Sequence, residues 1–560
     1  MADKDEIFTT GEKLEKMKRE AEERDAQRRA AKAKKEYLSP VKIPIEVEAL
    51  KLISEEEARR FKVASFQLKK PDAALAVYNP DDQAVQKLII SLEKEQGLRL
   101  KIFVVSESTL EHIWNFYKYV VKIVPPITGR VDIEREIFNK LLKELISPDK
   151  VKKTINEFDY KNRPTGQLLE IILAGALANR ASDIHLEPGE KNVDLRYRID
   201  GLLHKVVDTL ANEVYPTLIS RIKLFSHMKL NITDEPQDGR FTIGVGTKEI
   251  EMRVSAIPSE FGETLVMRIL DPEAILISLK ELGLRSDDYE ILERQIKEPN
   301  GMILNTGPTG SGKTTTLYAS LNHVKRPEIK IITIEDPIEY HLEGIEQTQV
   351  DLEAGYDFAN GLQSMMRQDP DVILVGEIRD AKTASIAVQA ALTGHLVFST
   401  VHANSATGAI PRLVDLEVRP SSIGPALNLI IAQRLVRQLC DKCKVSKKIT
   451  SEIEKNIKKF LGGLPERVDH KDYEKIKLFE PKGCPSCGGL GYKGRVAIME
   501  MMEVGPEIEK FITENVGEAE IKEFAAKKGM VTMQQDGVLK VISGITTLEE
   551  VENLTGAIQW

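Results

Sequence analysis

The segment Gly307–Thr315, with the sequence GPTGSGKTT, has the residue types and spacing of a phosphate-binding loop. It fits the pattern G-x-x-x-x-G-K-[ST], follows the apolar run MILNT and leads into the helix-like stretch TTTLYASLNHV. Glycines let consecutive backbone N–H groups wrap around phosphates at the positive end of a helix. A glycine-rich loop that merely begins a helix is the alternative, and this context disfavours it. The segment therefore predicts ATP binding.

Each part of this loop has an expected role. Lys313 would reach the β- and γ-phosphates, and the Thr314 hydroxyl would bind Mg²⁺. The predicted nucleotide-binding residues are Gly307, Pro308, Thr309, Gly310, Ser311, Gly312, Lys313, Thr314 and Thr315. The motif alone does not say what the ATP is used for.

Three downstream segments place polar residues at the ends of apolar runs. They are KIITIEDPIEY (330–340), DPDVILVGEIRD (369–380) and TGHLVFSTVHANSA (393–406). Apolar runs that alternate with longer helical stretches predict a mainly parallel sheet, whose ligand crevice lies at the carboxyl ends of its strands. Packing of a strand end does not require acids and histidines, so we interpret these residues as functional.

In this order, the four segments resemble the Walker A, aspartate box, Walker B and histidine box of the ATPases of type II secretion and type IV pilus systems. The resemblance implies a homohexameric motor that hydrolyses ATP. Glu339 would polarise the attacking water, and Glu377 would act through Mg²⁺ or its waters. His402 would sense the γ-phosphate. Arg253 and Arg268, from an upstream segment, would stabilise the charge that develops on that group.

Three further polar residues of these segments receive weaker interpretations. His395 is a second histidine candidate, but an isolated histidine is more often structural and could brace a strand end. Glu335 and Asp336 are secondary candidates for the catalytic carboxylate.

All four cysteines fall in two C-x-x-C pairs, Cys440 with Cys443 and Cys484 with Cys487. Two such pairs can place four thiolates around one tetrahedral ion. The segment between them is longer than in a compact ribbon, so we expect a helical insertion there. Two disulfides are the alternative, which a reducing compartment disfavours. The pattern predicts a structural zinc site, and in the resembled family it is typical of assembly and secretion ATPases rather than retraction ATPases.

A chain of 560 residues is too long for one core and implies three or four domains. We predict an α/β, multidomain fold. The resemblance implies a RecA-like P-loop ATPase core, a PAS-like middle domain, a small zinc-binding insertion and a small α/β N-terminal domain. The predicted boundaries are 1–36 for a charged, solvated tail, helical or disordered, 37–150 for an N-terminal docking domain, 151–272 for the PAS-like middle domain, 273–282 for a hinge linker, and 283–560 for the RecA-like ATPase domain with its tetracysteine motif at 440–487.

The assignment of the middle domain depends on the segments ASDIHLEP, LRYRIDG, EPQDGRF and MRVSAIPSEFGETLVMRIL, which resemble that domain of the family. Read without the resemblance, VDLRYRID and EIEMRVSAI alternate like half-buried strands with arginines on one face. The N-terminal segment resembles, more weakly, the module that docks such ATPases on partners at the inner membrane. It lacks the RLG-type motifs that bind cyclic di-GMP in some relatives, so docking is the expected role.

Charge and hydropathy bear on the partners and the cellular location expected for the protein. There are 79 basic and 87 acidic residues, so no global positive field favours nucleic acid, and none is expected as a partner. No apolar stretch reaches the ~20 residues of a membrane span, and no secretory h-region begins the chain. We expect a cytoplasmic protein, peripheral to the inner membrane through its partners.

The expected function is that of an ATP-driven motor for type IV pilus assembly, acting through an inner-membrane platform protein. A type II secretion ATPase that drives pseudopilus assembly is the closest alternative. A DNA-uptake or DNA-translocating P-loop ATPase is a lesser one. A scaffold that binds ATP and hardly hydrolyses it is disfavoured by the presence of Glu339 and Glu377.

Overall fold

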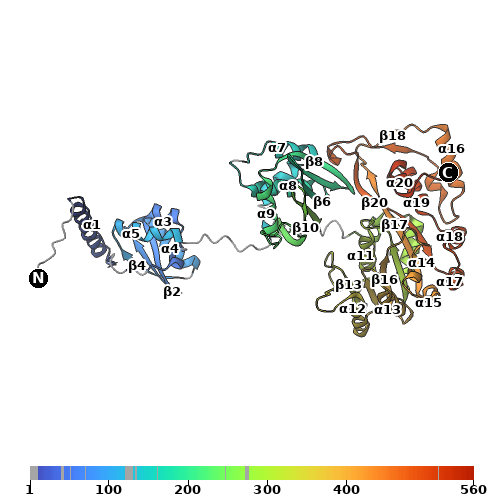
Figure 1. Cartoon of the computed structure of the whole chain (residues 1–560), viewed down its shortest axis with the longest axis horizontal. Helices are drawn as coiled ribbons and strands as arrows, with labels where there is room; N and C mark the ends of the chain where they lie inside the picture. Colours follow the sequence, from blue (N-terminus) through green and yellow to red (C-terminus); the bar gives the residue numbers. More distant parts are fainter. Residues whose placement is uncertain are drawn as a thin grey trace. The chain divides into compact units, whose positions relative to one another are not determined.

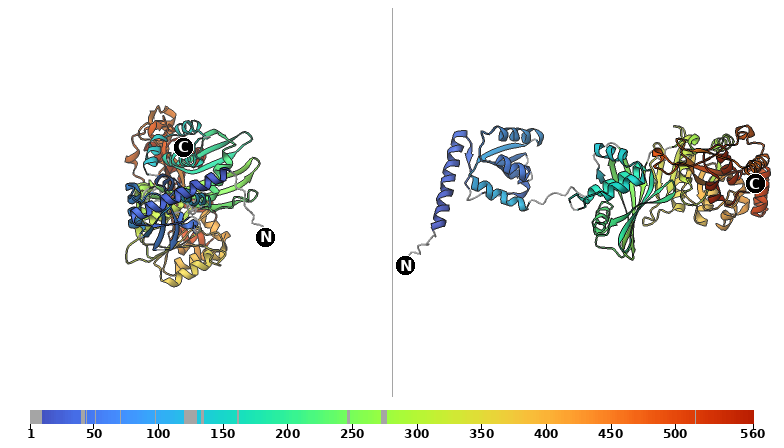
Figure 2. Two further views of the ribbon diagram at one scale, coloured as in Figure 1. Left: turned by 90° about the vertical axis from the view of Figure 1, so that its left-hand side faces the viewer. Right: turned by 90° about the horizontal axis from the view of Figure 1, so that it is seen from above.

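The chain divides into two structural units, Met1–Pro126 and Ile127–Trp560. The computed structural model (Figures 1 and 2) describes residues 10–39, 43, 45–50, 52–69, 71–96, 98–119, 130–132, 135–160, 162–245, 248–271, 277–514 and 516–560. Among these residues, no helix is both long enough and apolar enough to cross a membrane.

The first unit is a small α/β fold, as predicted. Its elements are α1 (Thr10–Ala33), β1 (Glu36–Tyr37), α2 (Val47–Leu50), α3 (Glu55–Phe61), β2 (Val63–Lys69), β3 (Asp72–Val77), α4 (Gln83–Gln96), β4 (Arg99–Val104) and α5 (Glu107–Trp114). The strand order is β1-β4-β3-β2, with only the β2–β3 pair antiparallel. Buried side chains such as Phe66, Leu75 and Ile113 form its core.

The long helix α1 packs on this unit, although its sequence is almost wholly polar (Figure 2). Two of its alanines are buried, and the Glu23 carboxylate accepts a hydrogen bond from the Ser106 hydroxyl at 2.5 Å. The Arg29 guanidinium stacks on the Tyr78 ring, 3.8 Å from its centre. The expectation of a merely solvated tail was therefore wrong for the helix, because specific polar pairs hold it. Residues 1–9 of the predicted tail lie outside the described residues.

The amino-terminal half of the second unit contains a seven-stranded sheet. Its elements are β5 (Arg130–Asp132), α6 (Arg135–Glu144), α7 (Pro148–Asn156), α8 (Thr165–Ala178), β6 (Ala181–Pro188), β7 (Asn192–Ile199), β8 (Leu202–Ala211), α9 (Tyr215–Phe225), β9 (Gln237–Val245), β10 (Lys248–Ser259) and β11 (Gly262–Leu270). The strand order is β5-β9-β10-β11-β6-β7-β8, and the pairs are antiparallel except for β5 with β9. We call residues 127–271 the middle domain.

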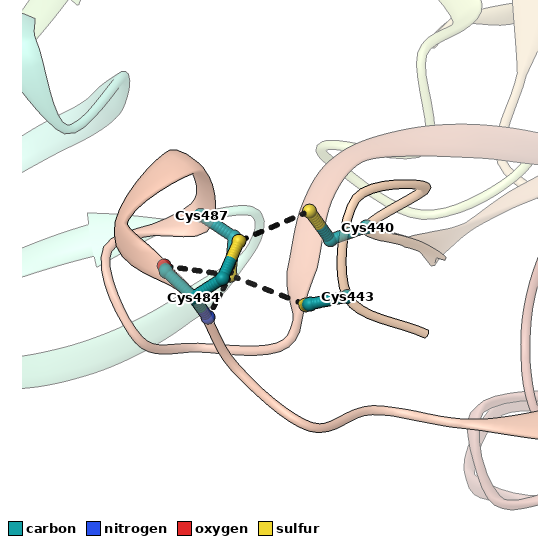
Figure 3. A group of neighbouring side chains, drawn as sticks. All are labelled: Cys440, Cys443, Cys484 and Cys487. Carbon is teal, nitrogen blue, oxygen red and sulfur yellow. Dashed lines mark hydrogen bonds between the residues drawn. The ribbon is translucent and has the colours of Figure 1, made fainter. Parts of the chain in front are cut away.

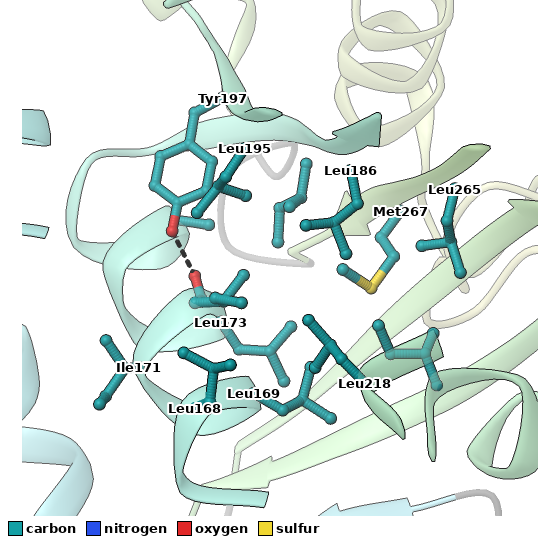
Figure 4. Packing of buried hydrophobic residues seen from close by; sticks show 14 of the residues in the cluster. Leu168, Leu169, Ile171, Leu173, Leu186, Leu195, Tyr197, Leu218, Leu265 and Met267 are labelled. Carbon is teal, nitrogen blue, oxygen red and sulfur yellow. Dashed lines mark hydrogen bonds between the residues drawn. The ribbon is translucent and has the colours of Figure 1, made fainter. Parts of the chain in front are cut away.

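One face of this sheet packs on helices and the other carries the polar residues. Side chains alternate between the two faces of a strand. Leu186, Leu195 and Met267 are fully buried and pack with residues of α8 (Figure 4). Tyr197 lies among them, and its hydroxyl donates to the carbonyl of Ile172 at 2.7 Å. The intervening residues of the strands, several arginines among them, therefore face away from this core.

The boundary between the first two domains differs from the predicted one. Phe138 and Leu145 are buried in the same core as α8 and the middle sheet. Residues 130–132 and 135–150, which we assigned to the docking domain, thus belong with the middle domain. The physical reason is that the apolar side of α6 finds its partner in α8, a long-range contact that the local pattern does not reveal.

The remainder of the second unit is built around a second seven-stranded sheet. Its elements are α10 (Ser286–Gln295), β12 (Gly301–Thr306), α11 (Lys313–Val324), β13 (Ile331–Glu335), β14 (Glu346–Gln349), α12 (Phe358–Met365), β15 (Val372–Val375), α13 (Ala381–Leu392), β16 (Leu396–Val401), α14 (Ala409–Asp415), α15 (Pro420–Ala426), β17 (Leu427–Leu439), β18 (Val445–Lys447), α16 (Ser451–Gly462), β19 (Leu478–Glu480), β20 (Tyr492–Glu503), α17 (Pro506–Thr513), α18 (Glu518–Lys527), α19 (Met533–Ile542) and α20 (Leu548–Thr555).

The strand order of this sheet is β14-β13-β15-β16-β12-β17-β20, parallel except for β20. Separate apolar cores cover its two faces, so helices flank it on both sides. The predicted α/β, multidomain fold with a mainly parallel sheet is confirmed. In such a sheet the carboxyl ends of the strands meet at one edge, which is where a ligand binds.

The predicted hinge, 273–282, is only partly a linker. Residues 272–276 lie outside the described residues. From Leu279 to Leu282 the chain forms a short 3₁₀ helix, and both leucines are buried in a core of the second sheet. The end of the predicted hinge is thus anchored to the ATPase domain.

Candidate active site and tetracysteine cluster

The predicted phosphate-binding loop joins β12 to α11, as its sequence indicated. Gly307 has φ 149°, and Gly312, which caps α11, has φ 90°. Residues with a Cβ rarely adopt such backbone angles, so glycine is required at both positions. A Cβ at Gly307 would also lie 2.6 Å from the carbonyl oxygen of Gln433. The loop is therefore a close-packed turn at the N-terminus of a helix, the geometry that binds anions.

The part of the loop that would face a ligand is open. Pro308, Thr309 and Thr314 are exposed, and no heavy atom lies within 4 Å of a Cβ position at Gly310. Ser311, in contrast, is buried, and its hydroxyl has no hydrogen-bond partner among the described residues. These side chains and the backbone N–H groups of the loop fit a nucleotide polyphosphate with Mg²⁺ on Thr314.

Lys313 occupies the start of α11 and turns back over the loop. Its Nζ donates to the carbonyls of Gly307 at 2.9 Å and Pro308 at 3.1 Å. Burial lowers the pKa of Lys313; the carboxylate of Glu377 opposes this shift, and the charge of Arg434 adds to it. The lysine is thus a half-buried cation placed next to the phosphate site.

Glu377 follows β15 and lies between two basic side chains. Its Oε1 pairs with Arg379 Nη2 at 2.5 Å, and its Oε2 lies 3.4 Å from His402 Nε2. The hydrogen bond that Arg379 donates to Glu377 raises the pKa of Arg379, against the smaller opposing effect of burial. The structure therefore brings the predicted Walker B carboxylate and the predicted sensor histidine together at the same edge of the sheet.

Glu339 is in contact with the middle domain. Arg253 on β10 donates from Nη1 to Glu339 Oε2 at 2.8 Å and from Nη2 to the carbonyl of Ile338 at 2.8 Å. The predicted water-polarising carboxylate and one predicted arginine thus meet within a single chain. An acid at this position and a guanidinium beside it can orient a nucleophile and stabilise developing negative charge.

Arg268 lies directly opposite Arg253 in the β10–β11 register. Its Nε donates to Asp183 Oδ1 at 3.1 Å, and its side chain is 56% exposed. Arg240 stands opposite Arg253 on the other side, so three arginines share one row across the uncovered face of the sheet. Arg268 belongs to this face, and among the described residues it forms no hydrogen bond or salt bridge with the phosphate-binding loop of its own chain.

Glu335 and His395, two of the weaker candidates, have hydrogen bonds that fit a structural role. Glu335 is buried and accepts hydrogen bonds from the hydroxyls of Tyr318 and Thr333. His395 precedes β16, so it lies at the amino end of that strand and away from the carboxyl ends, where we expect the ligand crevice. Its Nδ1 lies 3.0 Å from the carbonyl oxygen of Ala390, which fits the bracing role.

Four thiols meet at the end of the β17–β20 ribbon. All the Sγ atoms of Cys440, Cys443, Cys484 and Cys487 lie within 4.8 Å of one another (Figure 3). The closest pairs are 3.8 to 3.9 Å apart. Four sulfurs at ~2.3 Å from a central zinc would be about 3.8 Å apart, which agrees with these distances. The expected helical insertion between the pairs is present as α16.

The thiols are free, and backbone donors favour the ionised form of one of them. Burial opposes ionisation of Cys487, but N–H groups of Cys484 and Gly491, each 3.2 Å from its Sγ, lower its pKa to about 7. Zinc binds the thiolate, so these donors support the assignment of a metal site.

The second cysteine pair also touches the middle domain. We call residues 484–494 the second knuckle. Its Leu490 packs against the core of the middle domain, and the N–H of Gly494 donates to Asp200 Oδ2 at 3.0 Å. Arg180 Nη2 lies 3.6 Å from the same carboxylate oxygen. The cluster thus lies where the two domains of the larger unit meet.

Two residues beside the loop were missed by the sequence analysis. Gln433 is buried, and its Nε2 donates to the carbonyl of Ser311 at 2.7 Å. Arg434 follows it and carries its charge next to Gly307. The available signal was the polar pair QR inside the otherwise apolar stretch LNLIIAQRLV, where strand packing alone does not require it.

Comparisons with known proteins agree with this geometry. Residues 159–553 match the family described as "Type II/IV secretion system protein". The type II secretion system ATPase E of Vibrio cholerae is 42% identical over 392 residues, which is 70% of this chain and 75% of the relative. The type IV pilus assembly ATPase PilB of Myxococcus xanthus is 35% identical over 509 residues, covering 90% and 86%.

A solved structure shows the same fold. The ATPase DotB of Legionella pneumophila superposes with a TM-score of 0.52 at 22% identity, covering 71% of this chain and 98% of that one. The family match, the relatives and the intact phosphate-binding loop lead to one conclusion: this chain belongs to the type II/IV secretion system protein family and is an ATPase.

Proposed function

We propose that this protein is the homohexameric motor that drives type IV pilus assembly by ATP hydrolysis. The observation that carries the proposal is the extent of the likeness to a pilus assembly ATPase. That relative matches 90% of this chain, whereas the secretion ATPase of Vibrio cholerae matches 70%. The additional fifth of the chain includes most of the first unit, the part expected to dock on the rest of a machine.

A type II secretion motor is the second candidate. The observation that favours it is the higher identity, 42%, to a secretion ATPase over the region that contains the active site. Both systems require the same chemistry from this site, so the two candidates differ in the partners of the chain and not in its mechanism.

In the proposed mechanism, the phosphate-binding loop holds ATP, with Lys313 neutralising the β- and γ-phosphates. Mg²⁺, held by Thr314 and through water by Glu377, would draw charge from the phosphate oxygens. Glu339 would orient the attacking water and accept hydrogen bonds from it. His402, paired with Glu377, would respond to the γ-phosphate.

Movement would follow from the contact of Glu339 with Arg253. Because this arginine belongs to the middle domain, any change of charge at the catalytic centre alters an interdomain contact. Arg268, exposed on the same sheet, would reach the nucleotide of a neighbouring subunit in a ring. Repeated opening and closing would move an inner-membrane platform protein, with the first unit docked on partner proteins at the membrane.

Four thiolates around zinc leave no open coordination position, so the tetracysteine cluster would be structural. We propose that it holds the end of the β17–β20 ribbon and the second knuckle in place. The protein would act at the cytoplasmic side of the inner membrane, attached through its partners.

The two candidates can be separated in cells that lack this gene. Expression of the wild-type chain is expected to restore surface pili, and a Lys313→Ala chain is expected not to. Restored export of a secreted enzyme without pili would instead assign the protein to type II secretion. Complementation of neither process would contradict both.

A further inference from the structure

Arg434 lies beside the phosphate-binding loop because its strand, β17, pairs with β12, the strand that leads into the loop. In the parallel β12–β17 pair, Thr306, the last residue of β12, is opposite Ala432. β12 then turns into the loop, while β17 continues. A Cβ placed on Gly307 would lie 3.2 Å from Arg434 Nη1. The guanidinium is therefore next to the first glycine of the loop.

The partners of this guanidinium are neutral. Its Nη1 donates to the carbonyl of Gln433 at 3.1 Å, and its Nη2 lies 3.4 Å from both the carbonyl oxygen and Oδ1 of Asn404. Within the part of the chain that the structure describes, no carboxylate pairs with Arg434. A half-buried arginine without a counterion is unusual, since charges removed from water are normally paired.

Lys313 is in the same situation, because its hydrogen bonds go to the carbonyls of Gly307 and Pro308. Burial lowers the pKa of Arg434, against the opposing charge of Glu500. Burial also lowers the pKa of Lys313; the charge of Glu377 opposes this shift, and the charge of Arg434 adds to it. Two neighbouring cations that repel each other, and that form no salt bridge among the described residues, make a site suited to a multiply charged anion.

We propose that Arg434 binds the phosphates of ATP within its own chain, as a second cation beside Lys313. This inference rests on the ATPase function and adds a residue to its site. It differs from the role of the middle-domain arginines, because Arg434 is carried by the sheet that forms the loop. Its planar guanidinium can donate two parallel hydrogen bonds to phosphate oxygens, which a lysine cannot.

Gln433 positions both the loop and this arginine. Its Oε1 accepts hydrogen bonds from Asn305 Nδ2 at 2.8 Å and from Thr316 Oγ1 at 2.9 Å, while its Nε2 donates to Ser311. The side chain thus connects the strand before the loop, the loop itself and the helix after it. The adjacent Arg434, whose Nη1 donates to the carbonyl of Gln433, is thereby attached to the same network as the loop.

The test measures the affinity of a fluorescent ATP analogue in the full-length chain carrying Arg434→Gln or Arg434→Lys. Loss of a charge-assisted hydrogen bond predicts roughly ten- to hundredfold weaker binding for Arg434→Gln. Arg434→Lys should retain part of the affinity, because lysine keeps the positive charge. The remainder should be lost, because lysine cannot donate two parallel hydrogen bonds to phosphate oxygens. Affinity of the wild type should fall more steeply with added salt than that of Arg434→Gln.

Arg437→Gln on the same strand is the matched control. Arg437 pairs with Glu550 at 2.6 Å and stacks on Tyr492, so its loss should lower the unfolding temperature without changing nucleotide affinity. Wild-type affinity in Arg434→Gln would overturn the inference. So would an affinity loss matched by an equal loss of stability in the nucleotide-free chain, which would mean a structural role. A wild-type chain that binds no nucleotide would instead contradict the ATPase function itself.

Discussion

At the scale of residues, the candidate site consists of charged side chains that different elements carry. Lys313 comes from the loop, Glu377 from the end of β15, and Glu339 from the segment after β13. Arg253 reaches Glu339 from another domain at 2.8 Å. The consequence is that single charge-removing substitutions should separate nucleotide binding from hydrolysis.

Lys313→Ala is expected to reduce Mg²⁺-dependent ATP hydrolysis by a hundredfold or more, because it removes the cation that touches the loop carbonyls. Lys325→Ala is the matched control. Lys325 caps the carboxyl end of α11, the end opposite to the loop, and donates to the carbonyl of Glu343. Phosphate release at saturating ATP measures the effect. Undiminished turnover in Lys313→Ala would show that the loop is not the catalytic site.

Glu339→Gln and Glu377→Gln are each expected to lower kcat by about a hundredfold or more while ATP still binds, since neither carboxylate cradles the phosphates. Glu346→Gln, an exposed acid on the adjacent β14, should leave kcat unchanged. Steady-state kinetics together with analogue binding distinguish the two effects. If either Gln variant kept the wild-type kcat, that carboxylate would lose its catalytic assignment.

At the scale of elements, β17 connects the two sites of the ATPase domain. It carries Gln433 and Arg434 beside the loop and ends at Leu439, directly before Cys440. β20 begins within the second knuckle, at Tyr492, which pairs with Leu439. The tetracysteine cluster therefore closes the far end of the ribbon whose middle borders the nucleotide site.

Zinc removal should act locally for this reason. We expect one zinc per chain by elemental analysis of protein purified without added metal, and none in Cys484→Ser. Protease cleavage within the second knuckle should become at least several-fold faster in that variant, because the metal no longer joins the two cysteine pairs. ATP affinity should be retained.

Ser486→Ala is the control for this experiment, since it alters the knuckle without removing a thiolate. A zinc content near zero in the wild type would refute the site. Loss of ATP affinity in Cys484→Ser would show that the cluster supports the nucleotide site directly.

At the scale of the whole molecule, the arginines of the middle domain suggest more than one subunit. The guanidinium of Arg253 donates to Glu339 of its own chain, whereas that of Arg268 donates to Asp183 on the exposed face of the sheet. An exposed cation at such a face can serve the nucleotide of an adjacent copy once copies are arranged head to tail in a closed ring.

Specific ATPase activity should therefore rise with protein concentration as rings assemble. Arg268→Ala is expected to lower kcat about tenfold or more with little change in ATP affinity, because its contribution is made in the transition state. Light scattering measured in parallel gives the mass. A strictly monomeric protein with full, concentration-independent activity would exclude a ring motor. Arg240→Ala, in the same row of arginines, shows whether the effect is specific to Arg268.

The sequence by itself determined the features whose cause is local. The turn from β12 into α11 depends on glycines at positive φ, and the cysteine spacing depends on the chemistry of a tetrahedral ion. The mainly parallel direction of the ATPase strands followed from apolar runs separated by helical stretches. PAS-like character, the ring and the catalytic roles are predictions from the resemblance.

Only the tertiary structure decided the features that depend on residues far apart in the chain. Arg253 meets Glu339 across 86 positions, and Gln433 bonds to Ser311 across 122. Residues 135–150 join the middle domain because α6 packs on α8. The polar α1 packs through individual pairs such as Glu23 with Ser106. No local periodicity encodes such contacts, since each depends on which elements the completed fold places side by side.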